Sequence, residues 1–178
     1  GGDQTEGEMT GDKYHLVELP MGWMVLLGGK YGLKRASLKP TPDEAIEDLG
    51  SDLDSAEDDP DAFTGVIECL HRYAEGDMAA LDEIELDFSG VTPFFSAAWH
   101  ACRTIPAGET RSYAWLAVEA GSPLAVRAAG QAMARNRFSL IVPCHRVIAS
   151  DGGLGGYGGG GLGVKAKLLQ MELGEQDR

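Results

Sequence analysis

The chain contains the stretch Leu140-Ile141-Val142-Pro143-Cys144-His145-Arg146-Val147-Ile148, which sets one cysteine beside a histidine and an arginine, between two apolar runs. Apolar flanks of this kind favour a buried, rigid backbone. Cationic neighbours lower the pKa of a thiol from its usual value of about 8.5, and the thiolate is the nucleophilic form. The stretch therefore predicts a reactive thiol at Cys144. The alternative is a buried structural cysteine with an unrelated histidine after it, since free cysteine is often buried.

Length, cysteine content and the absence of long apolar runs limit the classes to which the protein can belong. The chain has 178 residues, of which 43% are hydrophobic, enough for one large or two small domains. Cys69, Cys102 and Cys144 do not form a disulfide framework and indicate a reducing cytoplasm. No apolar run approaches the roughly 20 residues that span a bilayer, and the acidic start does not resemble a signal peptide. We expect a cytoplasmic protein, or a nuclear one if the source is eukaryotic, with no membrane partner.

Charge is distributed unevenly along the chain. The net charge is −13; residues 1–92 hold 22 acidic and 6 basic residues, whereas residues 93–178 hold 6 acidic and 9 basic ones. A mildly basic half can lie near phosphates even when the whole chain is acidic. The acidic half is compatible with a role in solubility or with adaptation to salt.

The first half reads as short strands followed by helices. Apolar runs bounded by Gly and Pro predict strands over Tyr14–Leu19, Trp23–Leu27 and Tyr31–Leu38. The charge-dense stretch Thr41–Asp61 predicts an exposed loop with a short helix after Pro42. Helical spacing of apolar residues predicts a helix over Asp61–Ala74, and Leu81–Phe88 is expected to form another strand.

One small cluster in this half raises the question of a metal. Cys69 lies on the helix expected over Asp61–Ala74, close to Glu68 and His71. Two soft ligands fall short of the four that hold a structural zinc ion. We therefore favour a core cysteine beside a surface histidine, and predict no metal and no cofactor.

Composition and charge both change between Gly90 and Pro93, which predicts an N-terminal domain over residues 1–91 and a C-terminal domain over residues 92–178. Thr92 and Pro93 have the residue types that begin a helix. Apolar residues then follow at helical spacing as far as Cys102, before the break at Pro106.

A pair of helices is expected next. Ser112 would cap a helix from Tyr113 to about Ala120, and a second helix would run from Pro123 to about Arg135, which is a helix-turn-helix pattern. The second helix is expected to expose a face of small residues: Ala125, Ala128, Ala129, Gly130 and Ala132. Such a helix could approach a nucleic acid closely, with Arg127 projecting between bases. The alternative is a smooth helix that packs on another helix.

The end of the chain combines a glycine-rich stretch with a short helix. Asp151–Gly163 holds nine glycines around Tyr157. It contains a formal dinucleotide fingerprint, but neither the strand–turn–helix unit nor the later acidic residue that this motif needs. The glycines are instead expected to let backbone amides approach a flat ligand. Lys165–Leu173 is expected to form a helix that carries Glu172.

Together, residues 93–174 resemble the C-terminal domain of the O6-alkylguanine-DNA alkyltransferases, the suicide DNA-repair proteins. The matching positions are Trp99, Ile105-Pro106-Ala107-Gly108-Glu109-Thr110, Ser112-Tyr113, Arg127-Ala128-Ala129-Gly130, Asn136, Pro143-Cys144-His145-Arg146-Val147, Asp151-Gly152, Gly156-Tyr157, Lys165, Leu168-Leu169 and Glu172. The resemblance implies a mostly α-helical C-terminal domain with a helix-turn-helix, winged-helix-like. For residues 1–92 it implies, by position and rough strand–helix order, a ribonuclease-H-like α/β domain.

The resemblance also implies the activity: irreversible, stoichiometric transfer of an alkyl group from O6-alkylguanine in DNA, and by extension O4-alkylthymine, to Cys144. His145 would deprotonate the thiol through a water molecule, and Glu172 would orient the imidazole. Asn136 would belong to the same hydrogen-bond network. Tyr113 would donate a proton to the departing base.

For the partner, the resemblance implies double-stranded alkylated DNA bound through its minor groove by a monomer, with the target base flipped out of the stack. Arg127 would fill the space of the flipped nucleotide. The residues expected to contact DNA beside it are Val126, Ala128, Gly130 and Arg135. Those expected to line the base pocket are Val142, Ser139, Tyr157 and Gly158.

Two positions depart from the family pattern. Arg137 stands where the family usually has proline after the asparagine, and Ser139 stands where some members have a second proline. We therefore expect a looser pocket wall that tolerates bulkier alkyl groups or grips rigid benzyl-type inhibitors less well.

Three other classes of protein remain as alternatives. A non-enzymatic damage sensor of the same fold would lack the acceptor cysteine, which is present here. A transcription regulator would read bases in the major groove, for which Ala128, Ala129 and Gly130 are unsuitable. A cysteine hydrolase would turn over, and the sequence alone does not separate it from the transferase.

Overall fold

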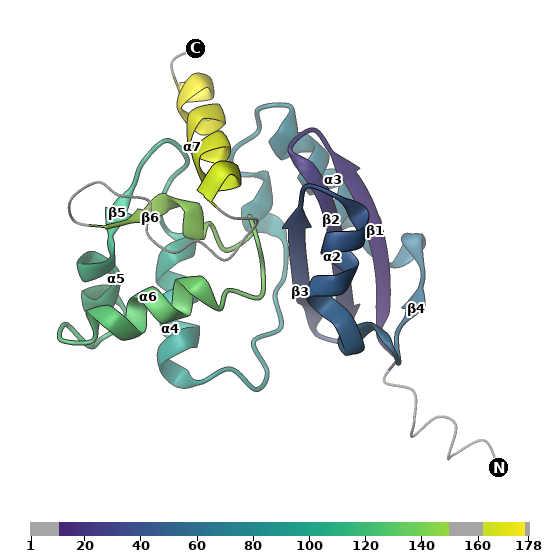
Figure 1. The fold of residues 1–178 in the computed structure, drawn as a ribbon, viewed down its shortest axis with the longest axis horizontal. Coiled ribbons are helices and arrows are strands. Elements are labelled where there is room, and N and C mark those ends of the chain that lie inside the picture. The colour runs from purple at the N-terminus through teal and green to yellow at the C-terminus, as the bar shows by residue number, and fades with distance from the viewer. Residues whose placement is uncertain (1–10, 150–161, 177–178) are drawn as a thin grey trace. The chain divides into compact units, whose positions relative to one another are not determined.

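A computed structural model describes residues 11–149 and 162–176, and the chain divides into two compact units between Asp87 and Phe88 (Figure 1). The domain boundary expected from composition, at residues 91–92, lies four residues further along. Among the described residues, no helix is long and apolar enough to cross a membrane.

The N-terminal unit is built on a four-stranded sheet. Its strands are β1 (Lys13–Leu19), β2 (Gly22–Gly29), β3 (Gly32–Lys39) and β4 (Glu57–Asp58), in the order β3-β2-β1-β4. The first three pair antiparallel through two-residue turns, and β4 pairs parallel with β1. At Gly32, φ is 117° and an added Cβ would lie 2.8 Å from the Glu85 carbonyl oxygen, so this turn requires glycine. The three predicted strands are thus confirmed.

Helices cover both faces of this sheet (Figure 1). The helical elements are α2 (Pro42–Leu49), η1 (Gly50–Leu53), η2 (Pro60–Phe63), α3 (Thr64–Ala74) and η3 (Ala80–Glu83). Thr41 caps α2, since its Oγ1 accepts a hydrogen bond from the Glu44 amide at 3.2 Å. The α2 face with Ala45 and Leu49 packs on Val25 and Leu27 of β2. Because β2 is covered on both faces, its apolar residues form a continuous run rather than an alternating pattern.

The prediction of a strand over Leu81–Phe88 is wrong. Leu81 and Ile84 are both buried at a spacing of three residues, which suits the 3₁₀-helix η3 that the structure has there. Only an isolated parallel bridge, between Leu33 and Leu86, remains of the expected strand within the described residues. It is held by the Leu33 amide donating to the Glu85 carbonyl at 3.0 Å.

The C-terminal unit is mostly helical. Its elements are α4 (Pro93–Arg103), β5 (Arg111–Ser112), α5 (Tyr113–Glu119), α6 (Val126–Ala134), η4 (Cys144–Arg146), β6 (Val147–Ile148) and α7 (Leu162–Gln176). The predicted caps are confirmed: Thr92 accepts from the Phe95 amide at 3.3 Å and Ser112 accepts from the Trp115 amide at 3.0 Å. The short strands β5 and β6 pair parallel.

The core of this unit centres on Trp99 of α4. Its ring meets Phe88 and Phe138 edge-on, with centroids 5.4 and 5.8 Å apart, and its Nε1 donates to the Ala132 carbonyl of α6 at 2.9 Å. These contacts fix α6 and the segment after it against α4. They thereby position the loop that carries the cysteine.

Two helix boundaries differ from the expected ones. The second helix of the pair begins at Val126 rather than Pro123, because residues 122–125 form a turn in which the Ala125 amide donates to the Ser122 carbonyl at 2.9 Å. The last helix is longer than Lys165–Leu173 at both ends.

Candidate active site

The cysteine follows a tight turn of the backbone. Pro143 has φ −80° and ψ 65°, and the Cys144 amide donates to the Val142 carbonyl at 2.7 Å, which is an inverse γ-turn. Proline suits the central position because its ring fixes φ near this value. Cys144 then begins η4, and its side chain is buried.

The amide of Asn136 holds this loop together. Its Nδ2 lies 3.2 Å from Cys144 Sγ, 2.9 Å from the Val142 carbonyl oxygen and 3.3 Å from that of Phe138. Its Oδ1 accepts from the Phe138 amide at 2.9 Å. One side chain therefore ties both ends of the loop to the sulfur, and an N–H donor aimed at sulfur favours the thiolate over the thiol.

The loop between Asn136 and Cys144 contains a strained residue. Leu140 is buried and has φ 74°, in the left-handed region that non-glycine residues rarely adopt. The α-turn in which the Val142 amide donates to the Phe138 carbonyl at 2.9 Å holds it there. Strain of this kind persists only where the surrounding contacts over-determine the backbone, and it is common next to functional side chains.

The histidine after the cysteine belongs to a buried chain of charged groups. His145 Nε2 lies 2.8 Å from Glu172 Oε2, and both side chains are fully buried. Burial lowers the pKa of His145, and Glu172 opposes this without reversing it. His145 is therefore neutral near pH 7, with its Nε2 proton donated to the carboxylate. Nδ1 is the unprotonated nitrogen, and it has no hydrogen-bond partner among the described residues.

Arg146 holds Glu172 from the other side. Its Nε donates to Oε1 at 2.9 Å and its NH2 group to Oε2 at 2.8 Å, while its NH1 group donates to the Ile105 carbonyl at 2.7 Å. Burial alone would raise the pKa of Glu172, but hydrogen bonds from His145 and Arg146 outweigh burial and hold the pKa well below its usual range. Glu172 is therefore a carboxylate near neutral pH.

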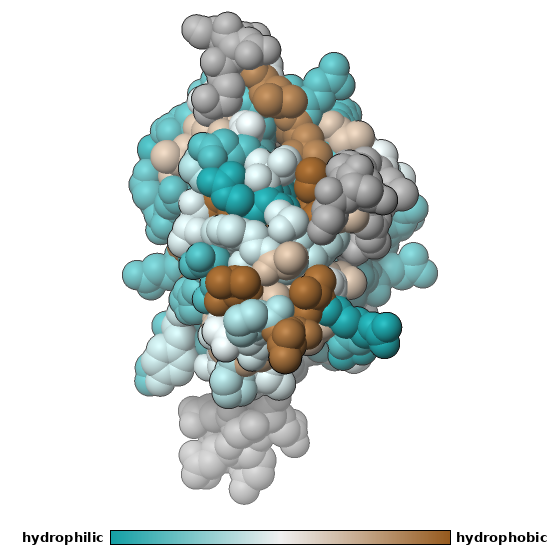
Figure 2. All heavy atoms as spheres, turned by 90° about the vertical axis from the view of Figure 1, so that its left-hand side faces the viewer, coloured by the Kyte–Doolittle hydropathy of each residue, from teal (hydrophilic) through white to brown (hydrophobic). Residues whose placement is uncertain are grey.

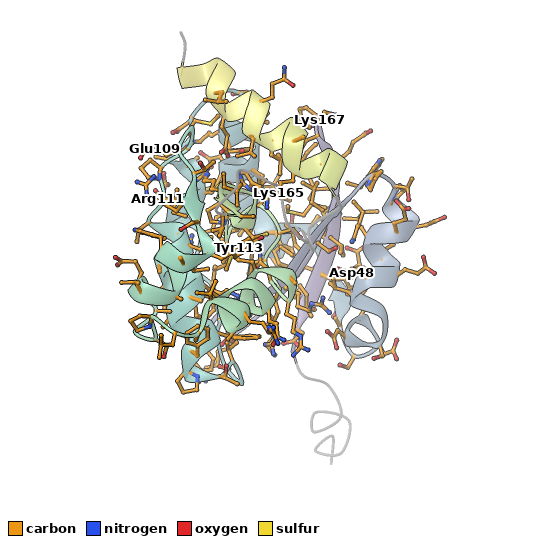
Figure 3. The ribbon with its side chains drawn as sticks, turned by 60° about the vertical axis from the view of Figure 1, so that its left-hand side comes forward. Asp48, Glu109, Arg111, Tyr113, Lys165 and Lys167 are labelled. Carbon is orange, nitrogen blue, oxygen red and sulfur yellow. The ribbon has the colours of Figure 1, made fainter. Side chains whose placement is uncertain are left out.

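Two further polar side chains interact electrostatically with Cys144. Tyr113, at the start of α5, is partly buried; burial raises its pKa, and Cys144 and Cys102 add to the shift, so its hydroxyl stays protonated. Lys165, on α7, is fully buried and donates to the Val147 carbonyl at 2.7 Å. Burial lowers the pKa of Lys165, against the effect of Cys144 and Cys102. Both side chains are labelled in Figure 3.

The residues expected to contact DNA lie on α6 or, for Arg135, directly after it, but only some of the small residues of α6 are exposed. Val126, Arg127 and Arg135 are exposed, and Ala128 and Gly130 are partly exposed. Ala129 and Ala132 are fully buried, so the expectation of one exposed face of small residues is wrong for these two. They face the core because Trp99 packs against this side of the helix and donates to Ala132.

The wall of the expected base pocket is described in part. Val142 and Ser139 are buried within the loop between Asn136 and Cys144, whereas Tyr157 and Gly158 lie outside the described residues. Within residues 11–149 and 162–176, no group of three or more His, Cys, Asp or Glu side chains could hold a metal ion.

The structure thus brings together Cys144, His145, Asn136 and Glu172, which the family resemblance assigned to one site. The sequence indicates Arg146 only as a cation beside the thiol and does not reveal that it binds Glu172. Nothing in the spacing of Arg146 and Glu172 could reveal it, because the contact depends on how α7 packs on η4.

The arrangement has the form of a cysteine nucleophile backed by a histidine and a carboxylate, on a unit with a helix pair that exposes arginines. The family model "6-O-methylguanine DNA methyltransferase, DNA binding domain" matches residues 93–174. The methylated-DNA–protein-cysteine methyltransferase of Mycolicibacterium paratuberculosis is 39% identical over 160 residues, which cover 90% of this chain and 92% of that protein.

Solved structures that resemble this chain carry the same family name. The crystal structure of Mycobacterium tuberculosis O6-methylguanine methyltransferase matches with a TM-score of 0.78 and 36% identity, covering 92% of this chain and 94% of that one. A structure of the M. tuberculosis protein in complex with DNA matches with a TM-score of 0.75, 36% identity and the same coverage. The chain belongs to the methylated-DNA–protein-cysteine methyltransferase family.

Proposed function

We propose that this protein repairs DNA by moving the alkyl group of O6-alkylguanine irreversibly onto Cys144, once per protein molecule. The observation that carries the proposal is the buried hydrogen-bond chain from Arg146 through Glu172 to His145, next to a sulfur that Asn136 contacts. The names of the relatives support the activity, since they are methylated-DNA–protein-cysteine methyltransferases.

The proton movement follows from the protonation states in the chain. Glu172 is ionised and accepts the Nε2 proton of His145, so Nδ1 carries the lone pair that can accept a proton. Because Nδ1 is buried without a partner among the described residues, a water molecule bound to it would relay the proton of Cys144. The imidazolium that forms is stabilised by the carboxylate.

The transfer step forms one bond and breaks one. The Cys144 thiolate attacks the alkyl carbon, a sulfur–carbon bond forms, and the bond from that carbon to O6 breaks. The departing guanine takes a proton from the Tyr113 hydroxyl, which is protonated at neutral pH, and the proton taken from Cys144 replaces it. The products are a thioether and unmodified guanine.

The DNA partner is double-stranded and is contacted through the minor groove by α6. The exposed Arg127 would fill the space of the flipped nucleotide, and Val126, Ala128, Gly130 and Arg135 would contact the strands beside it. The base pocket would be lined by Val142 and Ser139, together with Tyr157 and Gly158. The solved relative bound to DNA supports DNA as the partner.

Several finer features belong to the same proposal. The N-terminal unit would be ribonuclease-H-like and the helix-turn-helix winged-helix-like. The protein would act as a monomer, in the cytoplasm or, in a eukaryote, the nucleus, and would accept O4-alkylthymine as a second substrate.

The test is to incubate the protein with a duplex containing one O6-methylguanine and to digest it with trypsin. The peptide of residues 138–146 carries Cys144, and the peptide of residues 73–103 carries Cys102, which serves as the internal control. We expect at most one methyl group per protein, on the first peptide alone, and no transfer by Cys144→Ala. Methyl release into solution with repeated turnover would instead identify a hydrolase.

A further inference from the structure

Large apolar side chains are exposed around the turn between α5 and α6. Val118 near the end of α5 is 54% exposed, Leu124 in the turn is 99% exposed, and Val126 at the start of α6 is 41% exposed. Figure 2 shows hydrophobic atoms gathered in the lower half of the face at the level that α5 and α6 occupy in Figure 1. We call Val118, Leu124 and Val126 the apolar turn patch.

The fold does not need the side chain of Leu124. Backbone hydrogen bonds close the turn: the Gly121, Ser122 and Ala125 amides donate to the carbonyls of Val118, Ala117 and Ser122 at 3.0, 2.9 and 2.9 Å. At 99% exposure, Leu124 buries almost no surface in the free protein. A fully exposed leucine with exposed apolar neighbours is a feature of surfaces that bind something.

Charge around the patch identifies the kind of partner. In a chain of net charge −13, residues 120–149 contain four arginines and no aspartate or glutamate. Arg146 is buried against Glu172, which leaves Arg127, Arg135 and Arg137 at the surface. Arg127 on α6 and Arg135 directly after it are exposed, and Glu119 is the carboxylate next to this stretch. A surface that exposes more arginines than carboxylates fits a polyanion. Val126 and Arg127 are adjacent on the helix proposed to contact DNA, so the patch continues that interface.

We propose that the apolar turn patch packs against the deoxyribose wall of the DNA minor groove and supplies a part of the affinity that salt does not weaken. The proposal rests on the proposed function, because that function makes duplex DNA the partner. Apolar side chains are common in minor-groove contacts. The acidic chain repels DNA, and its phosphate contacts weaken as salt rises. Burial of Leu124 against a sugar is insensitive to that screening.

The test measures binding of the full chain to a short unmodified duplex over a series of salt concentrations. Leu124→Ser should weaken binding roughly tenfold at every salt concentration, with the slope of log K against log salt unchanged. Arg135→Ala, which removes an exposed arginine proposed to contact a DNA strand, should reduce the magnitude of that slope by about 0.9, because one phosphate contact is lost. Ile46→Ser, a matched change of an exposed residue on α2 in the N-terminal unit, should leave binding unchanged.

Other outcomes overturn the inference. Equal affinities of Leu124→Ser and the unsubstituted protein would show that the patch does not touch DNA. A loss confined to low salt would make the contact electrostatic. A change in the number of protein molecules per duplex, measured by sedimentation, would make the patch a contact between copies. Failure of the proposed function gives a different result, because a protein that moves no methyl group onto Cys144 can still show the Leu124 effect on binding.

Discussion

Replacing Glu172 with glutamine tests whether the buried charge chain supports both the fold and the chemistry. Glu172 accepts three hydrogen bonds of 2.8–2.9 Å from His145 and Arg146, and its side chain is fully buried. Glutamine offers one oxygen, and its NH₂ group would face N–H donors. Removing one partner of a buried ion pair costs about 3–5 kcal/mol of unfolding free energy. Because glutamine keeps one acceptor, we expect a loss near the lower limit of that range.

A surface pair of the same length provides the matched control. Glu109 Oε1 lies 2.8 Å from the Arg111 NH2 group, but the Glu109 side chain is 51% exposed. Both residues are labelled in Figure 3. Water screens such a pair, so Glu109→Gln should cost less than about 1 kcal/mol. The difference between the two variants measures what burial and the two additional hydrogen bonds of Glu172 contribute.

Urea unfolding followed by tryptophan fluorescence gives these free energies for the C-terminal unit alone. A Trp23→Phe background leaves Trp99 and Trp115, which both lie in that unit. In single-turnover assays we expect Glu172→Gln to slow methyl transfer about 100-fold, because the imidazole loses the group that orients it and stabilises its charge. Equal destabilisation by Glu172→Gln and Glu109→Gln, or an unchanged transfer rate, would refute this reasoning.

Three further predictions concern other parts of the site. Burial lowers the pKa of His145, so the imidazole stays neutral and methyl transfer should persist as the pH falls to about 6.5. Below that pH, His145 takes up a proton in the unfolded state more readily than in the folded state, so the melting temperature should decline. Trp99→Phe should cost about 1–3 kcal/mol in urea unfolding, because the Ala132 carbonyl loses a buried donor; an unchanged midpoint would contradict this. A benzyl-type O6-substituted guanine should inactivate this protein more slowly than a relative with proline at the position of Ser139, and equal rates would remove the idea of a looser wall.

Local features of the fold were predictable because they depend on near neighbours in the sequence. Thr92 and Ser112 cap their helices through amides three residues later, and each cap needs only the right residue type at the right place. The prediction of a strand over Leu81–Phe88 is wrong because the run is ambiguous and the segment depends on a contact distant in the sequence. A run this short fits helix and strand periods alike, and the Glu85 carbonyl of the irregular segment bonds to Leu33, far away in the sequence.

The residues of the candidate site that belong to a sequence motif were predictable. Contacts that arise only from the packing of distant elements were not. Cys144 and His145 are adjacent, and the family pattern supplied Asn136 and Glu172. The pairing of Arg146 with Glu172 spans 26 residues and depends on the position of α7. The burial of Ala129 depends likewise on α4, since small side chains suit both an exposed surface and a close helix contact.

The site contains residues from both sides of the glycine-rich stretch, so it stays in one covalent piece only while the chain is unbroken there. Lys165 and Glu172 both reside on α7, whereas Cys144 lies before the glycine-rich stretch that precedes this helix. A protease cut within that stretch would leave the sulfur on one fragment and the carboxylate behind the imidazole on the other. Counting free sulfhydryl groups in a preparation would therefore overstate its repair capacity, because nicked molecules would still be scored as intact.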